Sequence, residues 1–362
     1  MNHHLKAILA LLLALVMLLC SGCAAEDSVE PATDVPTDAP AEVSTEAPTE
    51  EPAPIPTLPP VIRNPYNGAA IEESFILRPF AVSINNVKPS MPQYGIGQAD
   101  IVYEMLVEYG LTRCLAIYSD ISAVEKIGSI RSARLYTYSL VQSCDAILVR
   151  CGGSSEADAA IHADGWDELD GYYLSEPFYR DKERRNAGYA MEHTMFTSGE
   201  LILENVAKRN LRTEREAAID YGLTFTEEAT PDGAAAGSIQ LVFSGSKSTS
   251  LIYNEEAGKY LAHQYDSPWI DKITGDTLAF DNVLILRAKV WTQEDGVHET
   301  IQLVGEGSGY FACGGQIIPI RWSRSADDEP FRYTLEDGSP LNIRVGKSYI
   351  GIVPMTANIS WE

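Results

Sequence analysis

Hydrophobic and polar positions divide the 362-residue chain into regions of different character. Residues 7–20 form an uninterrupted apolar run after a short basic start, which predicts an export signal peptide over residues 1–22. Residues 23–62 are rich in acids and prolines and nearly lack bulky apolar side chains. Such a segment cannot bury enough surface to offset its chain entropy, so we expect a disordered acidic, proline-rich tether.

Strand-like and helix-like periods alternate between residues 63 and 228, which predicts a mixed α/β domain. Alternating or short apolar runs predict strands at 80–86, 100–110, 111–120 and 145–153. Apolar positions at helical spacing predict helices at 129–144, 154–165 and 198–211. Residues 108–111 should turn the second strand back onto the third as a hairpin.

The pattern beyond residue 238 is almost entirely strand-like. Small residues, Pro and Gly at 226–238 indicate a linker, and turns such as "EEAG" and "LEDGS" then recur at hairpin spacing. We expect an antiparallel β domain over 238–362, either a sandwich or a partly closed barrel. The predicted fold class is therefore an α/β (mixed sheet) N-terminal domain plus a β-rich C-terminal domain.

Charge narrows the choice of partners. Without Lys6 and the nine acids of the tether, 42 acids face 26 bases, a net charge of −16. So acidic a body repels nucleic acid, and we predict no nucleic-acid partner. Any site for an anion must then be a local basic pocket rather than a broad surface.

The cysteines indicate an anchor rather than a metal site. "SGC" at residues 21–23 resembles the site at which lipoprotein signal peptidase cuts, which predicts a lipidated Cys23. A plain secretory signal or an uncleaved anchor is the alternative. No cysteine has metal-ligand spacing. We expect buried thiols at the later cysteines, with a Cys144–Cys151 disulfide as the alternative.

The stretch "IGSIRSARLY" (127–136) places two arginines where a helix should begin, with Ser129 as its N-cap. A helix N-terminus carries partial positive charge, so Arg131 and Arg134 should be compensated by a negative group. Tyr138 would share their helix face at i, i+3 and i+7 spacing. A neighbouring carboxylate and a bound anion both satisfy this expectation, since paired guanidiniums suit either.

A second candidate is the strand at 100–110, which has an apolar face and a face with three carboxylates. On the acidic face, Glu104 needs a cationic partner if the strand is central, because an isolated buried charge is costly. We expect that partner to be Arg113, Arg131 or Arg134. The cluster is either a structural ion-pair network or a site where arginines, with Glu108, clamp an anionic substrate while Glu104 acts as a base.

Three further residues are weaker candidates. His193 follows a charged loop and could act as an acid or base beside the arginines. Asn85 and Asp100 could contribute oxygen ligands to a polar site, but no residue pattern requires a metal, and we predict no metal and no cofactor.

Long ordered motifs resemble the YerB-like lipoprotein family of spore-forming and related Gram-positive bacteria. They include "RPFAVSINNVKPSMPQYGIGQADIVYEMLVEYGLTRCLAIYSD", "IGSIRSARLY", "LVRCGGSSEA", "EHTMF" and "GEGSGYFACGGQIIPIRWSR". The resemblance covers nearly all of residues 64–356 and implies two domains, both of unknown function, in an extracytoplasmic lipoprotein. The family's recurrent motifs fall here on Asn85, Asp100, Glu104, Glu108, Thr112, Arg113, Arg131, Ser132, Arg134, Gly152, Gly153 and His193. The pair His193-Thr194 departs from the family's more usual His-Asn, and the resemblance supplies no reaction.

These observations predict a monomer anchored by lipid to the outer face of the cytoplasmic membrane. Its partners would be that membrane and an anionic envelope component or envelope protein, bound in an Arg/Glu cleft of the N-terminal domain. The alternative is an envelope enzyme, a hydrolase or transferase acting on a phosphate-bearing or glycan substrate. Glu104→Gln separates the two, because it would abolish activity in the enzyme but change only stability or affinity in the binding protein.

Overall fold

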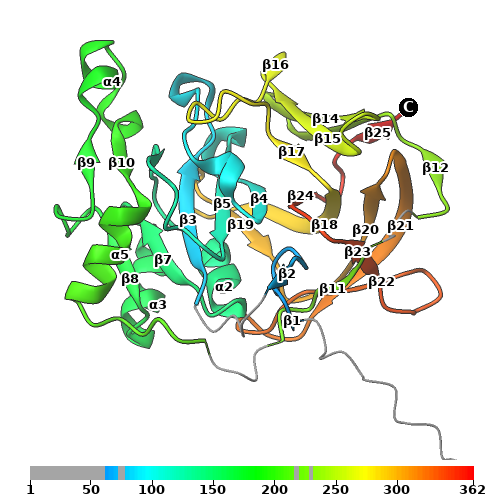
Figure 1. Ribbon diagram of the computed structural model, residues 1–362, viewed down its shortest axis with the longest axis horizontal. Coiled ribbons are helices and arrows are strands. Elements are labelled where there is room, and N and C mark those ends of the chain that lie inside the picture. The colour runs from blue at the N-terminus through cyan, green and yellow to red at the C-terminus, as the bar shows by residue number, and fades with distance from the viewer. Residues whose placement is uncertain (1–61, 72–77, 216–219, 228–230) are drawn as a thin grey trace, which may run out of the picture. The chain divides into compact units, whose positions relative to one another are not determined.

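The structure is a computed structural model that describes residues 62–71, 78–215, 220–227 and 231–362 (Figure 1). The predicted signal peptide, Cys23 and the predicted tether up to residue 61 lie outside the described residues. Within the described ranges, no helix is long and apolar enough to cross a bilayer.

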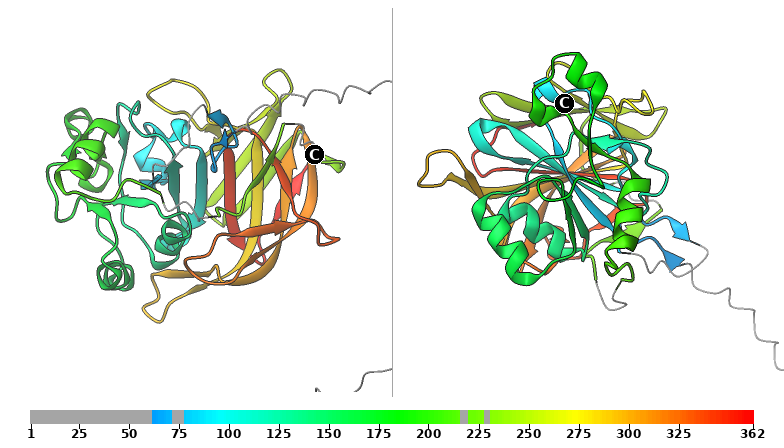
Figure 2. Two further views of the ribbon diagram at one scale, coloured as in Figure 1. Left: turned by 60° about the horizontal axis from the view of Figure 1, so that its bottom comes forward. Right: turned by 90° about the vertical axis from the view of Figure 1, so that its left-hand side faces the viewer.

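One large mixed sheet contains strands from both halves of the described chain. Its order from edge to edge is β12 (Ala234–Ala235), β21 (Gln316–Arg324), β20 (Gly305–Cys313), β18 (Asn282–Thr292), β24 (Ser348–Pro354), β4 (Ile101–Leu106), β5 (Thr112–Tyr118), β3 (Phe80–Asn85), β7 (Ile147–Arg150) and β8 (Glu168–Asp170). Two strands join from the side: β19 (Glu299–Gln302) pairs with β18, and β22 (Arg332–Thr334) pairs with β21. The halves meet at β24, which lies parallel to both β18 and β4 and is the red strand beside the cyan ones in Figure 2.

Both faces of this sheet are buried, which explains why its central strands are so apolar. Along β3, Ala81 contributes to one hydrophobic core, while Val82 and Ile84 contribute to the other. The helices α2 (Leu135–Ser143) and α3 (Ser155–Asp164) cover the first face. The helix α5 (Gly199–Lys208) and a second sheet cover the opposite face.

The second sheet is antiparallel and comes from the C-terminal half. Its order is β16 (Ser267–Pro268), β15 (Lys259–Gln264), β14 (Lys247–Asn254), β13 (Ser238–Ser244) and β25 (Ile359–Trp361), with β17 (Ala279–Phe280) paired to β15. Along β13, Ile239, Leu241 and Phe243 are buried against the large sheet, whereas Gln240 is exposed. This alternation is that of a sheet with one face in the core and one face in solvent.

Shorter elements complete the described chain. Two small sheets have two strands each: β1 (Ile62–Arg63) pairs with β2 (Ala70–Ile71), and β11 (Thr224–Thr226) pairs with β23 (Asn342–Arg344). A third has three strands, with β10 (Met195–Thr197) between β6 (Ile127–Gly128) and β9 (Tyr179–Arg180). One further short α-helix is α4 (Lys182–Asn186). The described chain also contains the 3₁₀ turns η2 (Lys88–Ser90), η3 (Ile96–Gln98), η4 (Glu108–Gly110) and η5 (Met191–His193). Ser154, Asp181 and Ser198 each accept a backbone N–H at the start of a helix, as N-cap residues do.

The predicted mixed sheet and the hairpin at 108–111 are confirmed, since β4 and β5 pair antiparallel around η4. The prediction that the β domain over 238–362 is purely antiparallel is wrong, because β18 and β24 within it pair in parallel. The apolar run of β24 is buried along almost its whole length, which is typical of a central parallel strand. The division near residues 228–238 stays a prediction; both hydrophobic cores contain residues from either side of it.

Candidate functional site

The segment that carries the two motif arginines is extended rather than helical. The helix α2 begins at Leu135 with Arg134 as its N-cap, so the prediction of a helix start at Ser129 is wrong. The backbone of this segment instead bonds to neighbouring strands: Arg131 N donates to Ser83 O, and Cys151 N donates to Arg131 O. Strand-like hydrogen bonds therefore outweigh the helical spacing of the side chains.

The predicted shared face of Arg131, Arg134 and Tyr138 does not form. The Tyr138 hydroxyl donates to Asp164 Oδ2, at the end of α3, at 2.7 Å, and Arg131 and Arg134 both precede the first residue of α2. The two arginines belong to two different clusters, which we call the Glu108 cluster and the Glu192 cluster after the acid that each contains.

The Glu108 cluster lies at the turn between β4 and β5. Arg134 contacts Glu108 Oε1 through both Nε and Nη2, and Arg113 Nη2 lies 3.8 Å from Glu108 Oε2. His298, from the loop before β19, places Nε2 3.7 Å from Glu108 Oε1. The predicted meeting of Glu108, Arg113 and Arg134 is thus present in the geometry.

In this cluster two guanidiniums share the single carboxylate of Glu108. Burial would raise the pKa of Glu108, but Arg113 and Arg134 outweigh it and hold that pKa below its usual value. Burial and the neighbouring Arg134 lower the pKa of Arg113 to about 9, against the opposing effect of Glu108. Arg113 Nη1 also donates to Ser132 O at 2.7 Å, so its guanidinium holds the extended segment in place.

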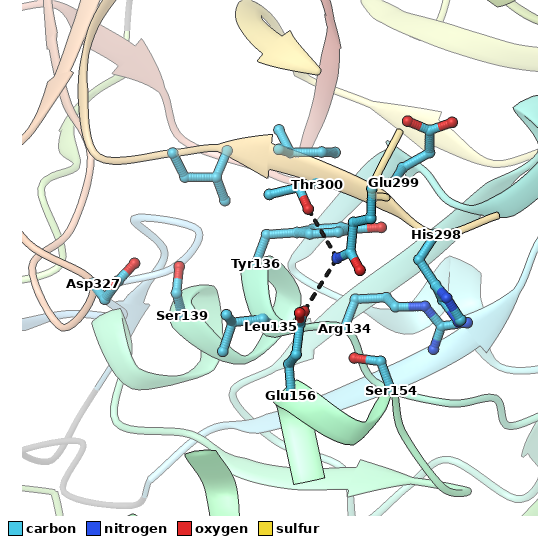
Figure 3. Close-up of a pocket in the computed structure, with 13 residues that line it drawn as sticks. Arg134, Leu135, Tyr136, Ser139, Ser154, Glu156, His298, Glu299, Thr300 and Asp327 are labelled. Atoms are coloured by element: carbon cyan, nitrogen blue, oxygen red, sulfur yellow. Dashed lines mark hydrogen bonds between the residues drawn. The ribbon is translucent and has the colours of Figure 1, made fainter. Parts of the chain in front are cut away.

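A cavity of about 110 Å³ adjoins this cluster (Figure 3). Arg134 and His298 line it together with acids, so its charge is mixed. The Gln293 amide donates to Glu156 Oε2 at 3.1 Å and to Thr300 Oγ1 at 2.9 Å, which ties the start of α3 to the β18–β19 hairpin. The cavity could hold a few water molecules or a small polar group, and no feature selects an anion there.

The Glu192 cluster lies beyond the carboxyl end of β3, the edge at which open α/β sheets commonly bind ligands. Arg131 Nη1 is 3.8 Å from Glu192 Oε2, and His193 Nε2 is 3.5 Å from Glu192 Oε1. On the other side of the imidazole, His193 Nδ1 is 2.9 Å from Asn85 Nδ2. A carboxylate therefore lies between a guanidinium and an imidazole that an amide orients.

These contacts determine the protonation state and the tautomer of His193. Burial, with Arg131 and Arg184, lowers the pKa of His193 against the opposing effect of Glu192, so the neutral ring dominates at pH 7. Because Asn85 Nδ2 can only donate, Nδ1 of the neutral ring accepts and Nε2 carries the hydrogen. Arg131 and His193 Nε2 thus both present donors to the carboxylate of Glu192.

Two polar atoms of the same region have no hydrogen-bond partner within the described residues. They are Arg131 Nε and Ser129 Oγ, both shielded from solvent. Buried polar atoms are normally bonded to protein or to water, and an unbonded one needs an explanation. A binding site that lacks its ligand would leave both atoms without a partner in this way.

Glu104 lies apart from every arginine of the motif. Its ion-pair partner is Lys247, with Nζ 3.0 Å from Oε1, and both side chains are fully buried. The expectation that Arg113, Arg131 or Arg134 compensates Glu104 is therefore wrong. Its oxygens accept further hydrogen bonds from Asn86, Thr112, Thr249 and Tyr349. This saturation favours a structural role over that of a base.

Asp100 is also separate from both clusters. It accepts hydrogen bonds from Asn67 Nδ2 at 2.5 Å and from the Ser119 backbone at 2.7 Å. Among the described residues, no group of three or more His, Cys, Asp or Glu side chains is arranged to hold a metal ion. Cys144 and Cys151 are thiols, so a disulfide between them is not formed.

Sequence reasoning missed three participants. Lys247 and His298 come from the C-terminal half, and no local pattern connects them with Glu104 or Glu108. The third is Glu192, which directly precedes His193. Because His193 was predicted to lie beside the arginines, the adjacent Glu192 could have been predicted to pair with Arg131.

The chain belongs to a two-part family of unknown function: residues 67–212 match the model "Protein of unknown function (DUF3048) N-terminal domain", and residues 239–350 match its C-terminal domain. It is similar to "Putative lipoprotein YerB" of Bacillus subtilis (strain 168), with 26% identity over 306 residues, which are 83% of this chain and 88% of the relative. The crystal structure of the Bacillus subtilis YerB protein superposes with a TM-score of 0.71 and 26% identity, covering 83% of this chain and 99% of that one. The resemblance to YerB expected from the motifs is confirmed, and the name of that relative describes it as a "putative lipoprotein".

Proposed function

We propose that this protein is an exported, lipid-anchored envelope protein that binds a carboxylate or phosphate group through Arg131 and His193. The anchor would be Cys23, at the outer face of the cytoplasmic membrane. The observation that supports the proposal is the carboxylate of Glu192 between the two donors, at 3.8 and 3.5 Å. These distances exceed those of charge-assisted hydrogen bonds, about 2.7–2.9 Å, so the donors are not saturated.

Exposure distinguishes this site from the Glu108 cluster. The Glu192 side chain is 54% exposed and that of Arg131 is 28% exposed, whereas Arg134 and Glu108 are almost buried. An exposed ion pair contributes about 0–1 kcal/mol, so an external anion can displace Glu192 at little cost. Ser129 Oγ and Arg131 Nε could then also gain a partner.

The revised site replaces the predicted Arg/Glu cleft. Arg113 and Arg134 support it, because Arg113 holds Ser132, the residue after Arg131, and Arg134 is the N-cap of the helix that follows. Asn85 orients His193 from behind. Binding is favoured over catalysis because Glu104, the proposed base, is sealed in a saturated network away from this site.

The test is titration of the full chain, in mild detergent, with inorganic phosphate, followed by calorimetry. Arg131→Ala should weaken binding about tenfold or more, the loss of about 1.4 kcal/mol expected for a charge-assisted contact. Glu192→Gln should tighten binding, because it removes the competing charge but keeps the side-chain shape. Arg185→Ala, at an exposed arginine of α4, is the matched control and should bind phosphate as the wild type does.

Three results would contradict the proposal. The first is the absence of phosphate binding at tens of millimolar. The second is equal weakening in Arg131→Ala and Arg185→Ala. The third is weaker binding in Glu192→Gln, because that would make Glu192 part of the binding surface rather than its competitor.

A further inference from the structure

A second concave region is lined mainly by residues of the C-terminal half, with Lys88, Pro89 and Leu111 contributed by the N-terminal half. It is a cavity of about 600 Å³ over the solvent face of the β13–β14 hairpin. Its walls come from η2 and from the turn between β15 and β16, Tyr265-Asp266. A cavity of about 330 Å³ adjoins it, and Lys88 and Tyr265 line both. We call the two together the Tyr265 groove.

The larger cavity offers neutral hydrogen-bonding groups. Ser244, Ser246, Ser248 and Gln240 line it, and hydroxyl and amide groups both donate and accept. Among the described residues, the side chains of Gln240 and Ser248 have no hydrogen bond to the protein. They are therefore available to a ligand without loss of an internal bond.

Charge in this cavity is balanced. Lys88 and Asp266 are both exposed at its rim and have opposite signs. Lys247, which also lines it, is compensated by Glu104. The groove therefore does not select an ion, in contrast to the site at Arg131.

The adjoining cavity is apolar and aromatic. It is lined by Met91, Pro92, Pro268, Trp269 and Ile270 beside the shared Tyr265. A ligand that spans both cavities needs many hydroxyl groups at one end and small apolar substituents at the other. Aromatic rings beside hydrogen-bonding groups are also the usual lining of small-molecule sites.

The backbone at Tyr265 adds a separate observation. Tyr265 and Asp266 have φ values of 54° and 62°, in the left-handed region where two-residue hairpin turns favour Asn and Gly. The Tyr265 hydroxyl donates to Asn86 O at 2.7 Å, which fixes the ring between the two cavities. A bulky side chain in this conformation is uncommon and often marks a functional site.

We propose that the Tyr265 groove binds a neutral oligosaccharide that carries acetamido groups. The sugar hydroxyls would bond to Gln240 and Ser248, a sugar face would lie against the Tyr265 ring, and an acetamido methyl would enter the apolar cavity. A free N-acetylated saccharide and a glycan strand of the envelope share this chemistry. The proposal does not depend on the anion site.

The experiment uses the full chain in mild detergent and two soluble probes, chitotetraose and cellotetraose, which differ in their acetamido groups. Chitotetraose should bind in calorimetry and cellotetraose should bind at least fivefold more weakly. Tyr265→Gly should weaken chitotetraose binding at least tenfold, and because Gly tolerates the positive φ, the variant should fold. Gln240→Ala should weaken binding about threefold or more.

Tyr109→Gly is the matched control. Tyr109 is also a turn tyrosine with positive φ, is 74% exposed and lines neither cavity. It should leave chitotetraose binding unchanged. Absence of chitotetraose binding, equal binding of both probes, or binding by Tyr265→Gly at wild-type strength would overturn the proposal. Arg131→Ala should bind chitotetraose normally, so failure of one site is distinguishable from failure of the other.

Discussion

The buried pair of Glu104 and Lys247 gives the sharpest prediction about stability. Glu104 is on β4, and Lys247 begins β14 in the other half of the chain. Lys247→Met removes the cation but keeps an unbranched side chain of similar length. Glu104 then remains as an uncompensated charge in the core, with only neutral hydrogen-bond donors around it.

The magnitude follows from burial. Both side chains are 0% exposed and the charged atoms are 3.0 Å apart. Removing one partner of a buried pair typically costs about 3–5 kcal/mol, and the lost bonds from Lys247 Nζ to Gln264 and Thr249 place this pair within that range. Glu104→Gln should cost a similar amount, because it leaves Lys247 charged. The double variant should cost clearly less than the sum, since neither charge remains.

Urea unfolding, followed both by far-UV circular dichroism and by tryptophan fluorescence, measures these free energies. Lys259→Met is the matched control, because its ion pair with Asp281 is 3.3 Å long and the lysine is 38% exposed. It should cost less than about 1 kcal/mol. A cost below about 1 kcal/mol for Lys247→Met, or additive effects in the double variant, would refute the claim that the pair is a coupled element of the core.

Three further changes test other parts of the structure. Glu108→Gln should lower the free energy of unfolding at pH 7 by roughly 1–3 kcal/mol, the cost of leaving two buried cations without their acceptor. Because the pKa of Glu108 is lowered in the folded state, its ionised form contributes stability above about pH 4.3, and this stability is lost as pH falls through the folded-state pKa. In acid titrations between pH 5 and 3, the variant should therefore lose less stability than the wild type. The lowered pKa of His193 makes the wild type lose stability as pH falls just below about 6.5, and His193→Gln should flatten this part of the stability profile. Free energies of unfolding at pH 7.5, 6.5 and 5.5 measure the difference. Gly199→Ala should lower the midpoint of thermal unfolding and cost at least about 1–3 kcal/mol, because its Cβ would lie 1.8 Å from Ile121 O.

Local periodicity was sufficient for most elements but not for the start of α2. The spacing of Ala133, Thr137, Leu140 and Val141 does describe one helix face, and α2 indeed buries the last three of these residues. Residues 129–133 fit the same period, yet their N–H and C=O groups bond to Ser83, Met195, Cys151 and Gly152. Those partners are distant in sequence, so no local pattern could reveal that an extended segment competes with the helix.

The same limit applies to charge compensation. A sequence shows that Glu104 needs a cation, because an isolated buried charge is costly. It does not show which cation, because Lys247 and Thr249 lie on β14 of the second sheet, and only the packing of the two sheets brings them to Glu104. By contrast, Glu108 is five residues from Arg113 along a hairpin, and that proximity was visible in the pattern.

Compensation also distinguishes structural arginines from the candidate binding arginine. Arg134 is almost buried and contacts Glu108 through two nitrogens, so displacing Glu108 would leave charges stranded in the protein. Arg131 is more exposed, and its acid lies 3.8 Å away on a side chain that is itself half exposed. An incoming anion could therefore replace Glu192 while water solvates the displaced carboxylate. In a strongly acidic chain, the arginine whose acid can move away is the one left available for a ligand, and this argues for Arg131 rather than Arg134 as the point of contact.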